Sequence, residues 1–263
     1  MRIVKFNSLE STNKYCEALD LMQVEDFTCY WALEQTAGIG QRTPAPLRGT
    51  SPCQGREFNR WEAAPRKNLT FSLVLHPTFL PADRQFKLTE ALSLALFDFL
   101  KYFKESKGFN DLKVKWPNDI YVGGCKICGT LVSTRLQGKQ IASAICGIGL
   151  NINQAEFPDW VPNPTSLSLL TGQQYELEPL LYQLLHCIEA RYNDLTTGID
   201  PEPEYLKHLM NLGSCARYIY NEKEIIATIT GVDKYGHLLL TVDDGRRLCC
   251  GMKEISLING SCA

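Results

Sequence analysis

A short segment of alternating polar and apolar residues, 68–76, precedes a long segment whose apolar residues recur at helical spacing, 88–104. Alternation is typical of a half-buried β-strand, whereas apolar residues three or four positions apart form one face of a helix. Segments rich in β-branched and aromatic residues predict further strands at 2–7 and 27–35, with a helix over 11–22 between them. Strands that alternate with helices predict an α/β fold built on a sheet.

The second half of the chain continues this alternation and then changes character. We predict a strand at 112–116, followed by a hairpin whose turn contains Gly123 and Gly124. A further strand at 140–153 and a long helix at 179–195 follow it. Near the C-terminus only short strands remain, separated by turn residues. We therefore expect a mixed α/β domain over 1–211 and a small all-β unit over 212–263 that packs against it.

The charge and hydropathy of the chain argue against two kinds of partner. Lys and Arg total 27 against 29 Asp and Glu, a formal net charge of -2, so no overall basic field is expected for nucleic acid or an anionic membrane. Charged residues interrupt the longest apolar segments, whereas a membrane span needs about 20 mostly apolar residues. The first residues show no secretion signal, so we expect a cytoplasmic protein.

The eleven cysteines are expected to be free thiols, because disulfides are rare in the cytoplasm. Cys125 and Cys128 form a CxxC pair, but a zinc site needs further ligands at chelating spacing. The four histidines are scattered, and Cys249 and Cys250 are adjacent rather than spaced as a chelate. We therefore predict no metal site.

Residues 43–60 contain three prolines, two glycines and three arginines, with little apolar periodicity. This composition predicts a long irregular loop that is either a binding lid or an inert insertion.

Glycine-rich turns follow two of the predicted strands, at 37–42 and 147–151. Glycine allows a ligand to approach the backbone, whose N–H groups can hold phosphate or carboxylate oxygens. Neither turn completes a dinucleotide-binding motif or a P-loop. The segment 115–119, with Lys126 on the second arm of the hairpin, could handle phosphoryl or acyl charge. The alternative interpretation of this segment is structural: Trp116 belongs to the core, residues 117–119 form an ordinary turn, and both lysines are solvated.

The order of these segments resembles that of biotin protein ligases over nearly the whole chain. The matching segments are Glu10 to Asn13, Glu34 to Arg42, Lys115 to Asp119, Lys126 to Gly129, Gly147 to Asn151 and Lys253 to Leu257. The KWPND sequence followed by a lysine seven residues beyond its aspartate is the most specific of them. The resemblance is to the monofunctional type, because only ten residues precede Ser11 and a DNA-binding helix-turn-helix would need dozens.

The resemblance implies a catalytic domain related in fold to class II aminoacyl-tRNA synthetases and lipoate ligases, followed by an SH3-like barrel. The implied activity is that of a ligase forming a C–N bond. Biotin and ATP, with Mg²⁺, form biotinyl-5′-AMP, and a lysine of a biotin carboxyl carrier protein then takes up the biotinyl group. Specific DNA binding and membrane binding are not implied.

The resemblance also assigns site residues. Lys126 matches the lysine that contacts the biotin carboxylate and the adenylate phosphate, and Lys115 and Asp119 match polar positions near the phosphate and the incoming amine. The positions matched to biotin or adenylate binding, besides Lys126, are Ser11, Thr12, Asn13, Gln35, Gly38, Ile39, Gly40, Gln41, Arg42, Gly129, Gly147, Gly149 and Asn151.

Two departures from the family pattern keep alternatives open. Ile39 stands where the loop usually has an arginine, and the tryptophan that normally follows within a few residues is Trp61, beyond the apparent insertion at 43–60. A biotin-binding protein without ligase activity is therefore one alternative. A lipoate or octanoate ligase, which shares the fold and the adenylation chemistry, is another.

Overall fold

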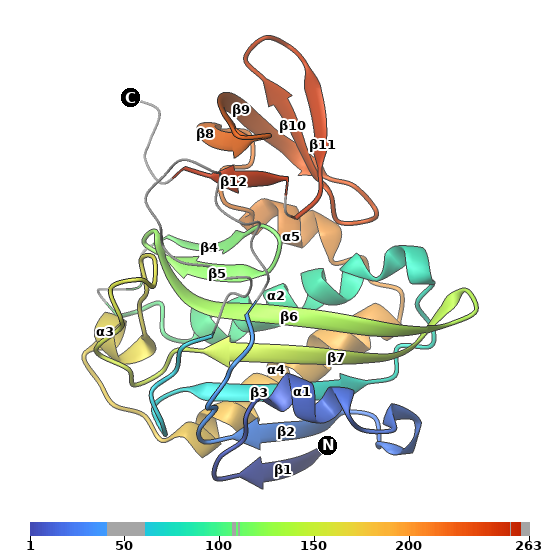
Figure 1. Ribbon diagram of the computed structural model, residues 1–263, viewed down its shortest axis with the longest axis vertical. Coiled ribbons are helices and arrows are strands. Elements are labelled where there is room, and N and C mark those ends of the chain that lie inside the picture. The colour runs from blue at the N-terminus through green and yellow to red at the C-terminus, as the bar shows by residue number, and fades with distance from the viewer. Residues whose placement is uncertain (41–60, 107–108, 110, 253, 259–263) are drawn as a thin grey trace.

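The computed structural model describes residues 1–40, 61–106, 109, 111–252 and 254–258, so the predicted loop at 43–60 lies outside the described residues. These residues form a seven-stranded sheet flanked by helices and a five-stranded sheet at one end of the molecule (Figure 1). The larger unit contains β1 (Arg2–Phe6), α1 (Thr12–Glu17), β2 (Thr28–Ala32), β3 (Leu69–Leu75), α2 (Phe86–Lys101), β4 (Leu112–Lys115), β5 (Asp119–Val122), β6 (Cys125–Gln137), β7 (Gln140–Leu150), α3 (Leu167–Thr171), α4 (Leu177–Thr196) and α5 (Glu202–His208). The smaller unit contains β8 (Cys215–Tyr220), β9 (Lys223–Val232), β10 (Leu238–Val242), β11 (Arg247–Cys250) and β12 (Ile255–Leu257).

The larger sheet is mixed, with its strands in the order β1-β2-β3-β7-β6-β5-β4. β1 pairs with β2 in parallel, and the other neighbouring strands pair antiparallel. β3 is buried at every position because helices or other segments cover both of its faces. A mixed sheet with helices packed on it confirms the predicted α/β class.

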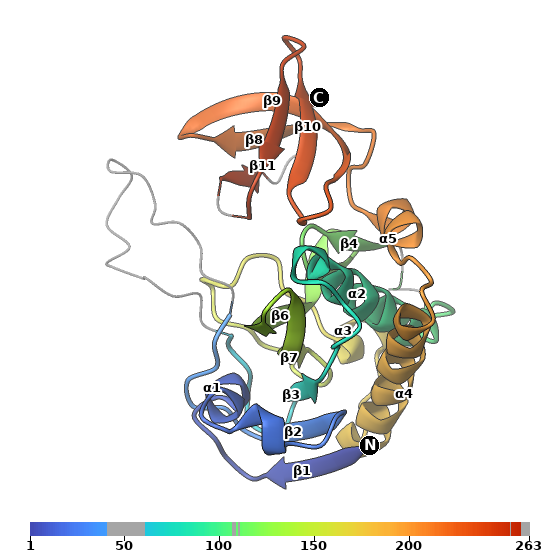
Figure 2. The same ribbon diagram turned by 90° about the vertical axis from the view of Figure 1, so that its right-hand side faces the viewer.

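Helices lie on both faces of this sheet. α2 and α4 cover one face and α1 covers the other (Figure 2). α2 is buried on almost all sides because it packs against the sheet, α4 and α5, and a helix that is apolar all round belongs in a core. The buried Lys87 of α2 is paired, with its ammonium 3.1 Å from Glu90, 2.7 Å from Asp200 and 2.8 Å from Glu202.

The helix predicted over 11–22 is correct at its start and wrong at its end. Ser11 caps α1, since its hydroxyl accepts a hydrogen bond from the Lys14 N–H at 3.5 Å. The Asp20 carboxylate accepts a hydrogen bond from the Met22 N–H at 3.2 Å and so starts a separate 3₁₀ turn. This second cap interrupts an apolar pattern that would otherwise continue as one helix.

The C-terminal sheet is antiparallel, in the order β11-β10-β9-β8-β12. The predicted short strands are thus confirmed. Within the described residues β11 and β12 are the edge strands of this sheet, and the SH3-like barrel expected from the resemblance stays a prediction.

The C-terminal unit contacts the larger one through the turn between β9 and β10. The indole N–H of Trp116 donates to the Gly236 carbonyl at 3.0 Å. Gly236 has a φ of 89° and packs so closely on the Phe86 ring that a Cβ at this position would overlap it. Beside them the Lys234 ammonium lies 3.2 Å from Asp83.

The two long predicted helices correspond to α2 and α4. α3 and α5, which are 5 and 7 residues long, were not predicted, because such short helices show too little periodicity. Across the part of the chain that the structure describes, every helix is too short or too polar to cross a bilayer.

Candidate active site

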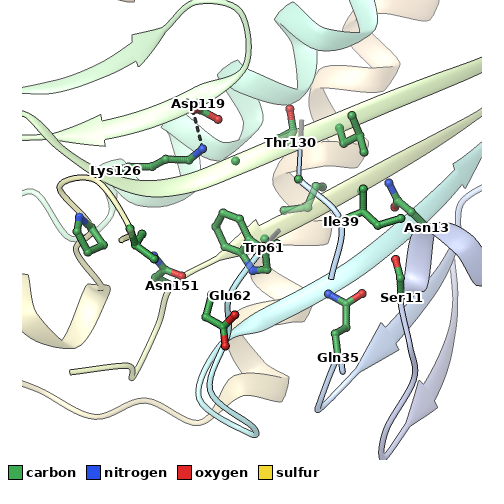
Figure 3. Close-up of a pocket in the computed structure, with 18 of the residues that line it drawn as sticks. Ser11, Asn13, Gln35, Ile39, Trp61, Glu62, Asp119, Lys126, Thr130 and Asn151 are labelled. Carbon is green, nitrogen blue, oxygen red and sulfur yellow. Dashed lines mark hydrogen bonds and ion pairs between the residues drawn. The ribbon is translucent and has the colours of Figure 1, made fainter. Parts of the chain in front are cut away.

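A cavity of about 480 Å³ lies between α1, the central strands β6 and β7, and the segment that follows β7 (Figure 3). Its lining residues are Ser11, Thr12, Asn13, Gln35, Ile39, Gly40, Trp61, Glu62, Phe71, Asp119, Lys126, Gly129, Thr130, Leu131, Gly147, Ile148, Gly149, Asn151, Phe157, Trp160, Val161, Pro162 and Pro164. They combine a neutral polar end, a charged end and apolar walls, as a ligand site usually does.

Neutral polar side chains form one end of the cavity. The Thr12 N–H donates to the Gln35 side-chain oxygen at 2.7 Å, and the Thr12 hydroxyl lies 3.2 Å from the same oxygen. The Ser72 hydroxyl lies 2.8 Å from the Thr12 hydroxyl and contacts the amide oxygen of Asn13. Hydroxyl and amide groups both donate and accept, so this end suits an uncharged ligand group with several hydrogen-bonding atoms.

Glycines on β7 allow other segments to approach the floor of the cavity. A Cβ at Gly147 would overlap the side-chain amide of Asn13, and a Cβ at Gly149 would overlap the indole of Trp61. The backbone of Trp61 is also fixed, because its N–H donates to the Gly38 carbonyl at 3.0 Å. These glycines are therefore required for close packing rather than for an unusual backbone angle.

An ion pair lies at the other end of the cavity. Gly123 and Gly124, with φ angles of 56° and 79°, turn the hairpin that brings Asp119 of β5 beside Lys126 of β6. The Lys126 ammonium lies 2.6 Å from the Asp119 carboxylate, and the two side chains are 28% and 24% exposed. Gly129 faces both, since a Cβ there would lie 3.1 Å from the carboxylate and 3.2 Å from the ammonium. A ligand in the cavity can therefore reach the cation.

Two buried polar atoms beside the cavity have no hydrogen-bond partner among the described residues. They are Nε1 of Trp61 and the side-chain oxygen of Asn151. The Trp61 ring also faces Lys126, whose ammonium lies 5.8 Å from the ring centroid. Buried polar atoms are normally hydrogen-bonded, so these two atoms are candidates for contact with a bound ligand.

Lys115 lies behind this charged end and does not line the cavity. Its backbone lies opposite that of Asp119 in the β4–β5 pairing, and its ammonium contacts the Tyr121 hydroxyl at 3.3 Å. Burial lowers the pKa of Lys115, and the Lys126 charge lowers it further while Asp119 opposes both. Its predicted contact with phosphate or amine stays a prediction.

An apolar wall that the sequence analysis missed follows β7. It consists of Phe157, Trp160, Val161, Pro162 and Pro164. The segment is held against β6, because the Lys126 N–H donates to the Asn163 carbonyl at 2.7 Å and the Lys126 carbonyl accepts from the Thr165 N–H at 2.9 Å. Its cluster of aromatic residues and prolines is the only local signal that could have indicated it.

Most of the site residues predicted from the sequence meet in this cavity. Those that line it are Ser11, Thr12, Asn13, Gln35, Ile39, Gly40, Asp119, Lys126, Gly129, Gly147, Gly149 and Asn151. Gly38 lies beside it through its contact with Trp61. Gln41 and Arg42 lie outside the described residues.

Comparison with known proteins shows similarity to biotin and lipoate ligases. Residues 49–151 match the biotin/lipoate A/B protein ligase family. The chain is 27% identical over 248 residues to a Bacillus subtilis protein named bifunctional ligase/repressor BirA, covering 92% of this chain and 70% of that protein. It is 28% identical over 230 residues to the biotin--[acetyl-CoA-carboxylase] ligase of Paracoccus denitrificans, covering 85% of this chain and 94% of that protein.

The fold is also similar to a solved structure. A biotin protein ligase from Aquifex aeolicus, in complex with biotin and ATP, superimposes with a TM-score of 0.74 at 22% sequence identity. The superposition covers 98% of this chain and 99% of that one. The likeness extends over both sheets and establishes the fold.

Proposed function

We propose that this chain, whose residues 49–151 match the biotin/lipoate A/B protein ligase family, is an ATP-dependent biotin protein ligase. It activates biotin as biotinyl-5′-AMP and transfers the biotinyl group to a lysine of a biotin carboxyl carrier protein. The observation that carries the proposal is the arrangement of one cavity, with neutral hydrogen-bonding groups at one end and Lys126 at the other. This arrangement suits a ligand with an uncharged polar head and a carboxylate tail.

The polar end suits the ureido group of biotin. A urea offers one carbonyl acceptor and two N–H donors, and the Ser11, Thr12, Asn13 and Gln35 side chains supply both kinds of partner. Between the two ends, the Trp61 ring and neighbouring apolar side chains would cover the ring and the valeryl chain of biotin.

The charged end suits the activation step. A biotin carboxylate oxygen attacks the α-phosphorus of ATP, the bond from that phosphorus to the oxygen of the β-phosphate breaks, and pyrophosphate leaves. Negative charge develops on the phosphate oxygens as this happens. The Lys126 ammonium, fixed by Asp119 at 2.6 Å, would offset that charge without first having to reorganise.

The same end suits the transfer step. The uncharged amine of the carrier lysine attacks the acyl carbon, the C–N bond forms, the C–O bond to AMP breaks, and the amine loses a proton. Asp119 is a carboxylate at this end that can accept the proton. The covering Trp61 ring and the apolar wall would limit hydrolysis of the adenylate by excluding water.

We also propose three finer features. ATP enters as its Mg²⁺ complex, in which the phosphate oxygens of ATP supply the oxygen ligands that Mg²⁺ prefers. The chain divides into a catalytic domain over 1–211 and an SH3-like unit over 212–263. The protein reads no DNA sequence, since a net charge of -2 provides no overall basic field.

Exchange of labelled pyrophosphate into ATP tests the activation step without a carrier protein. Biotin is expected to support exchange in the presence of Mg²⁺, whereas lipoate and octanoate are expected to support little. Exchange with lipoate alone would favour the lipoate ligase alternative. Biotin binding without exchange would show a binding protein that lacks ligase activity.

A further inference from the structure

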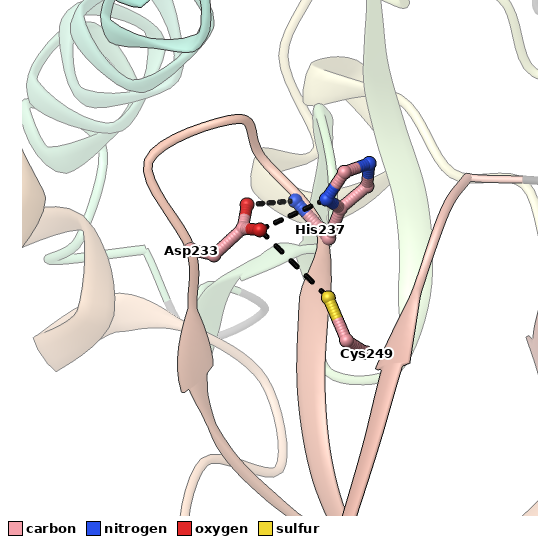
Figure 4. Close-up of side chains that lie close together, drawn as sticks. All are labelled: Asp233, His237 and Cys249. Atoms are coloured by element: carbon pink, nitrogen blue, oxygen red, sulfur yellow. Dashed lines mark hydrogen bonds and ion pairs between the residues drawn. The ribbon is translucent and has the colours of Figure 1, made fainter.

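Three groups of the kind that bind metal ions meet on the C-terminal sheet, away from the active-site cavity. They are the carboxylate of Asp233, the imidazole of His237 and the thiol of Cys249, and one ligand atom from each lies within 4.8 Å of the others (Figure 4). In the part of the chain that the structure describes, this is the one place where three such groups gather.

The sheet itself brings these groups together. Asp233 and His237 flank the turn from β9 to β10, and Cys249 of β11 pairs with Leu239 of β10. Residues two apart on a strand point to the same face, so His237 and Cys249 are diagonal neighbours on one face of the sheet. The spacing of 233, 237 and 249 shows no chelating pattern, which explains why the sequence predicted no metal site.

Asp233 is held in place before any ligand binds. Its carboxylate accepts hydrogen bonds from the backbone N–H of Tyr235 at 2.9 Å and of His237 at 2.8 Å. The His237 Nδ1 lies 2.9 Å and the Cys249 Sγ lies 3.7 Å from the other carboxylate oxygen. Ligand atoms around a tetrahedral zinc ion lie about 3.3–3.6 Å apart, given bonds of about 2.0–2.3 Å. Small side-chain shifts would therefore complete the geometry.

The arrangement does not suit nucleophilic catalysis by the thiol. A catalytic thiol needs an adjacent base and a lowered pKa. Here Sγ faces the carboxylate rather than a free imidazole nitrogen. Partial burial and the Asp233 charge also raise the pKa of Cys249, and the charge of Glu254 adds to this effect.

We propose that Asp233, His237 and Cys249 form a binding site for a divalent transition metal of the zinc class, with solvent in the fourth position. Nitrogen, sulfur and oxygen ligands together suit Zn²⁺ and Co²⁺, whereas Mg²⁺ and Ca²⁺ prefer oxygen ligands alone. The His237 side chain is 45% exposed, so an ion can enter from solvent.

A bound ion would link the β9–β10 turn to β11. This turn carries Lys234 and Gly236, which contact the larger unit. The site would therefore stabilise the segment through which the two units meet. The proposal is independent of the ligase reaction, because none of the three ligands lines the active-site cavity.

Co²⁺ titration of the reduced, chelator-treated full chain tests the site. A Co²⁺ ion bound by a thiolate gives a charge-transfer absorption band that water and carboxylates alone do not produce. The wild type is expected to show this band and to lose it when Zn²⁺ is added. The Cys249→Ser variant is expected to lack the band, and both Cys249→Ser and His237→Gln are expected to bind Zn²⁺ at least tenfold more weakly.

Cys215→Ser is the matched control, because Cys215 is another exposed thiol on the same sheet. It is expected to keep the band and the affinity of the wild type. Zn²⁺ should also raise the melting temperature of the wild type and of this control, but not that of Cys249→Ser. A wild type without the band, or a band of equal intensity in Cys249→Ser, would overturn the proposal.

Discussion

The ion pair between Lys126 and Asp119 places a fixed cation where the proposed reaction develops negative charge. Its 2.6 Å separation and partial exposure leave the ammonium oriented by protein and still open to a ligand. A preorganised charge of this kind stabilises a transition state more than a flexible surface lysine does. The distance between Lys126 and Asp119 is therefore expected to affect the rate of biotinyl-adenylate formation.

Lys126→Ala is expected to lower the rate of biotinyl-adenylate formation by about 10²–10³-fold, as removal of one preorganised donor typically does. Biotin affinity should fall less, because the polar end of the cavity is unchanged. Pyrophosphate release measured at saturating biotin and ATP checks the rate, and calorimetry checks the affinity.

Two further variants separate the role of the cation from general effects. Lys223→Ala removes an exposed lysine of β9 in the other unit and should leave the rate unchanged. Asp119→Asn retains the ammonium and should lower the adenylation rate less than Lys126→Ala does. A normal rate of pyrophosphate release in Lys126→Ala would remove this residue from the mechanism.

Glu90 on α2 makes the stability of the protein depend on pH. The side chain is almost completely buried, and burial raises its pKa to about 7 although Lys87 opposes the shift. The unfolded chain releases this proton near the ordinary value of 4.5, so the folded state binds more protons between these two pH values. The free energy of unfolding due to Glu90 is therefore greatest below pH 4.5 and falls as pH rises to about 7.

Glu90→Gln should remove this dependence, because an amide does not titrate. The unfolding free energy of the wild type minus that of the variant should fall by up to about 3 kcal/mol across the window, from 1.36 kcal/mol per pKa unit. Urea denaturation at several pH values measures the difference. A difference that stays constant with pH would contradict the assignment.

Single residues differ in how far the sequence alone could place them. Lys126 and Asp119 were predictable as a pair, since a two-glycine turn between them sets the hairpin that joins them. Lys115 was not, because whether a lysine at a strand end points into the cavity or against Tyr121 depends on packing around β4. Trp61 reaches the cavity through long-range contacts with Gly38 and Gly149 that no local pattern encodes.

The central strand β7 forms the floor of the cavity, and its glycines determine how closely other segments can approach. Gly149→Ala should displace the Trp61 indole, since the added Cβ would overlap the ring. The biotin KM is expected to rise by about tenfold or more, the cost of about 1.4 kcal/mol of lost binding. Steady-state kinetics with varied biotin measure this change.

Gly251→Ala is a suitable control for that variant. An added Cβ there meets its nearest atoms at 3.7 Å, an ordinary van der Waals distance, and Gly251 does not line the cavity. Its biotin KM should equal that of the wild type. Equal KM values for Gly149→Ala and the wild type would show that the position of Trp61 does not affect biotin binding.

Helices and strands were predictable where a regular apolar pattern continued over many residues. α2 and α4, at 16 and 20 residues, gave clear apolar faces, and the strands of both sheets gave alternation or apolar runs. The segment 157–164 gave neither, because its side chains line the cavity from an irregular backbone. Its role follows from the pairing of Lys126 with residues 163 and 165, which only the folded chain brings together.

The two units of the molecule meet next to the segment that carries Asp119. Trp116, three residues before Asp119, donates to the Gly236 carbonyl of the C-terminal unit at 3.0 Å. The position of the C-terminal sheet is thus coupled to the charged end of the cavity through β4, β5 and the turn between them. No local pattern predicted this contact, because it joins residues 120 positions apart.

Trp116→Phe keeps most of the apolar contact and removes the N–H donor. The free energy of unfolding should fall by about 1–3 kcal/mol, since the Gly236 carbonyl loses its partner at a half-buried interface. Urea denaturation measures the change, and Tyr235→Phe, an exposed substitution in the same turn, should leave stability within about 0.5 kcal/mol of the wild type. Equal stability of Trp116→Phe and the wild type would show that this contact contributes nothing.

The whole molecule is proposed to join biotin to a carrier protein at the expense of ATP. The most direct test incubates the full chain with biotin, Mg²⁺, ATP and a biotin carboxyl carrier domain, and determines the intact mass of the carrier. The account predicts one biotinyl group on a single lysine of the carrier, and none when ATP is omitted or that lysine is replaced by arginine. A carrier that stays unmodified under the complete conditions, while a known biotin protein ligase modifies it in parallel, would contradict the account.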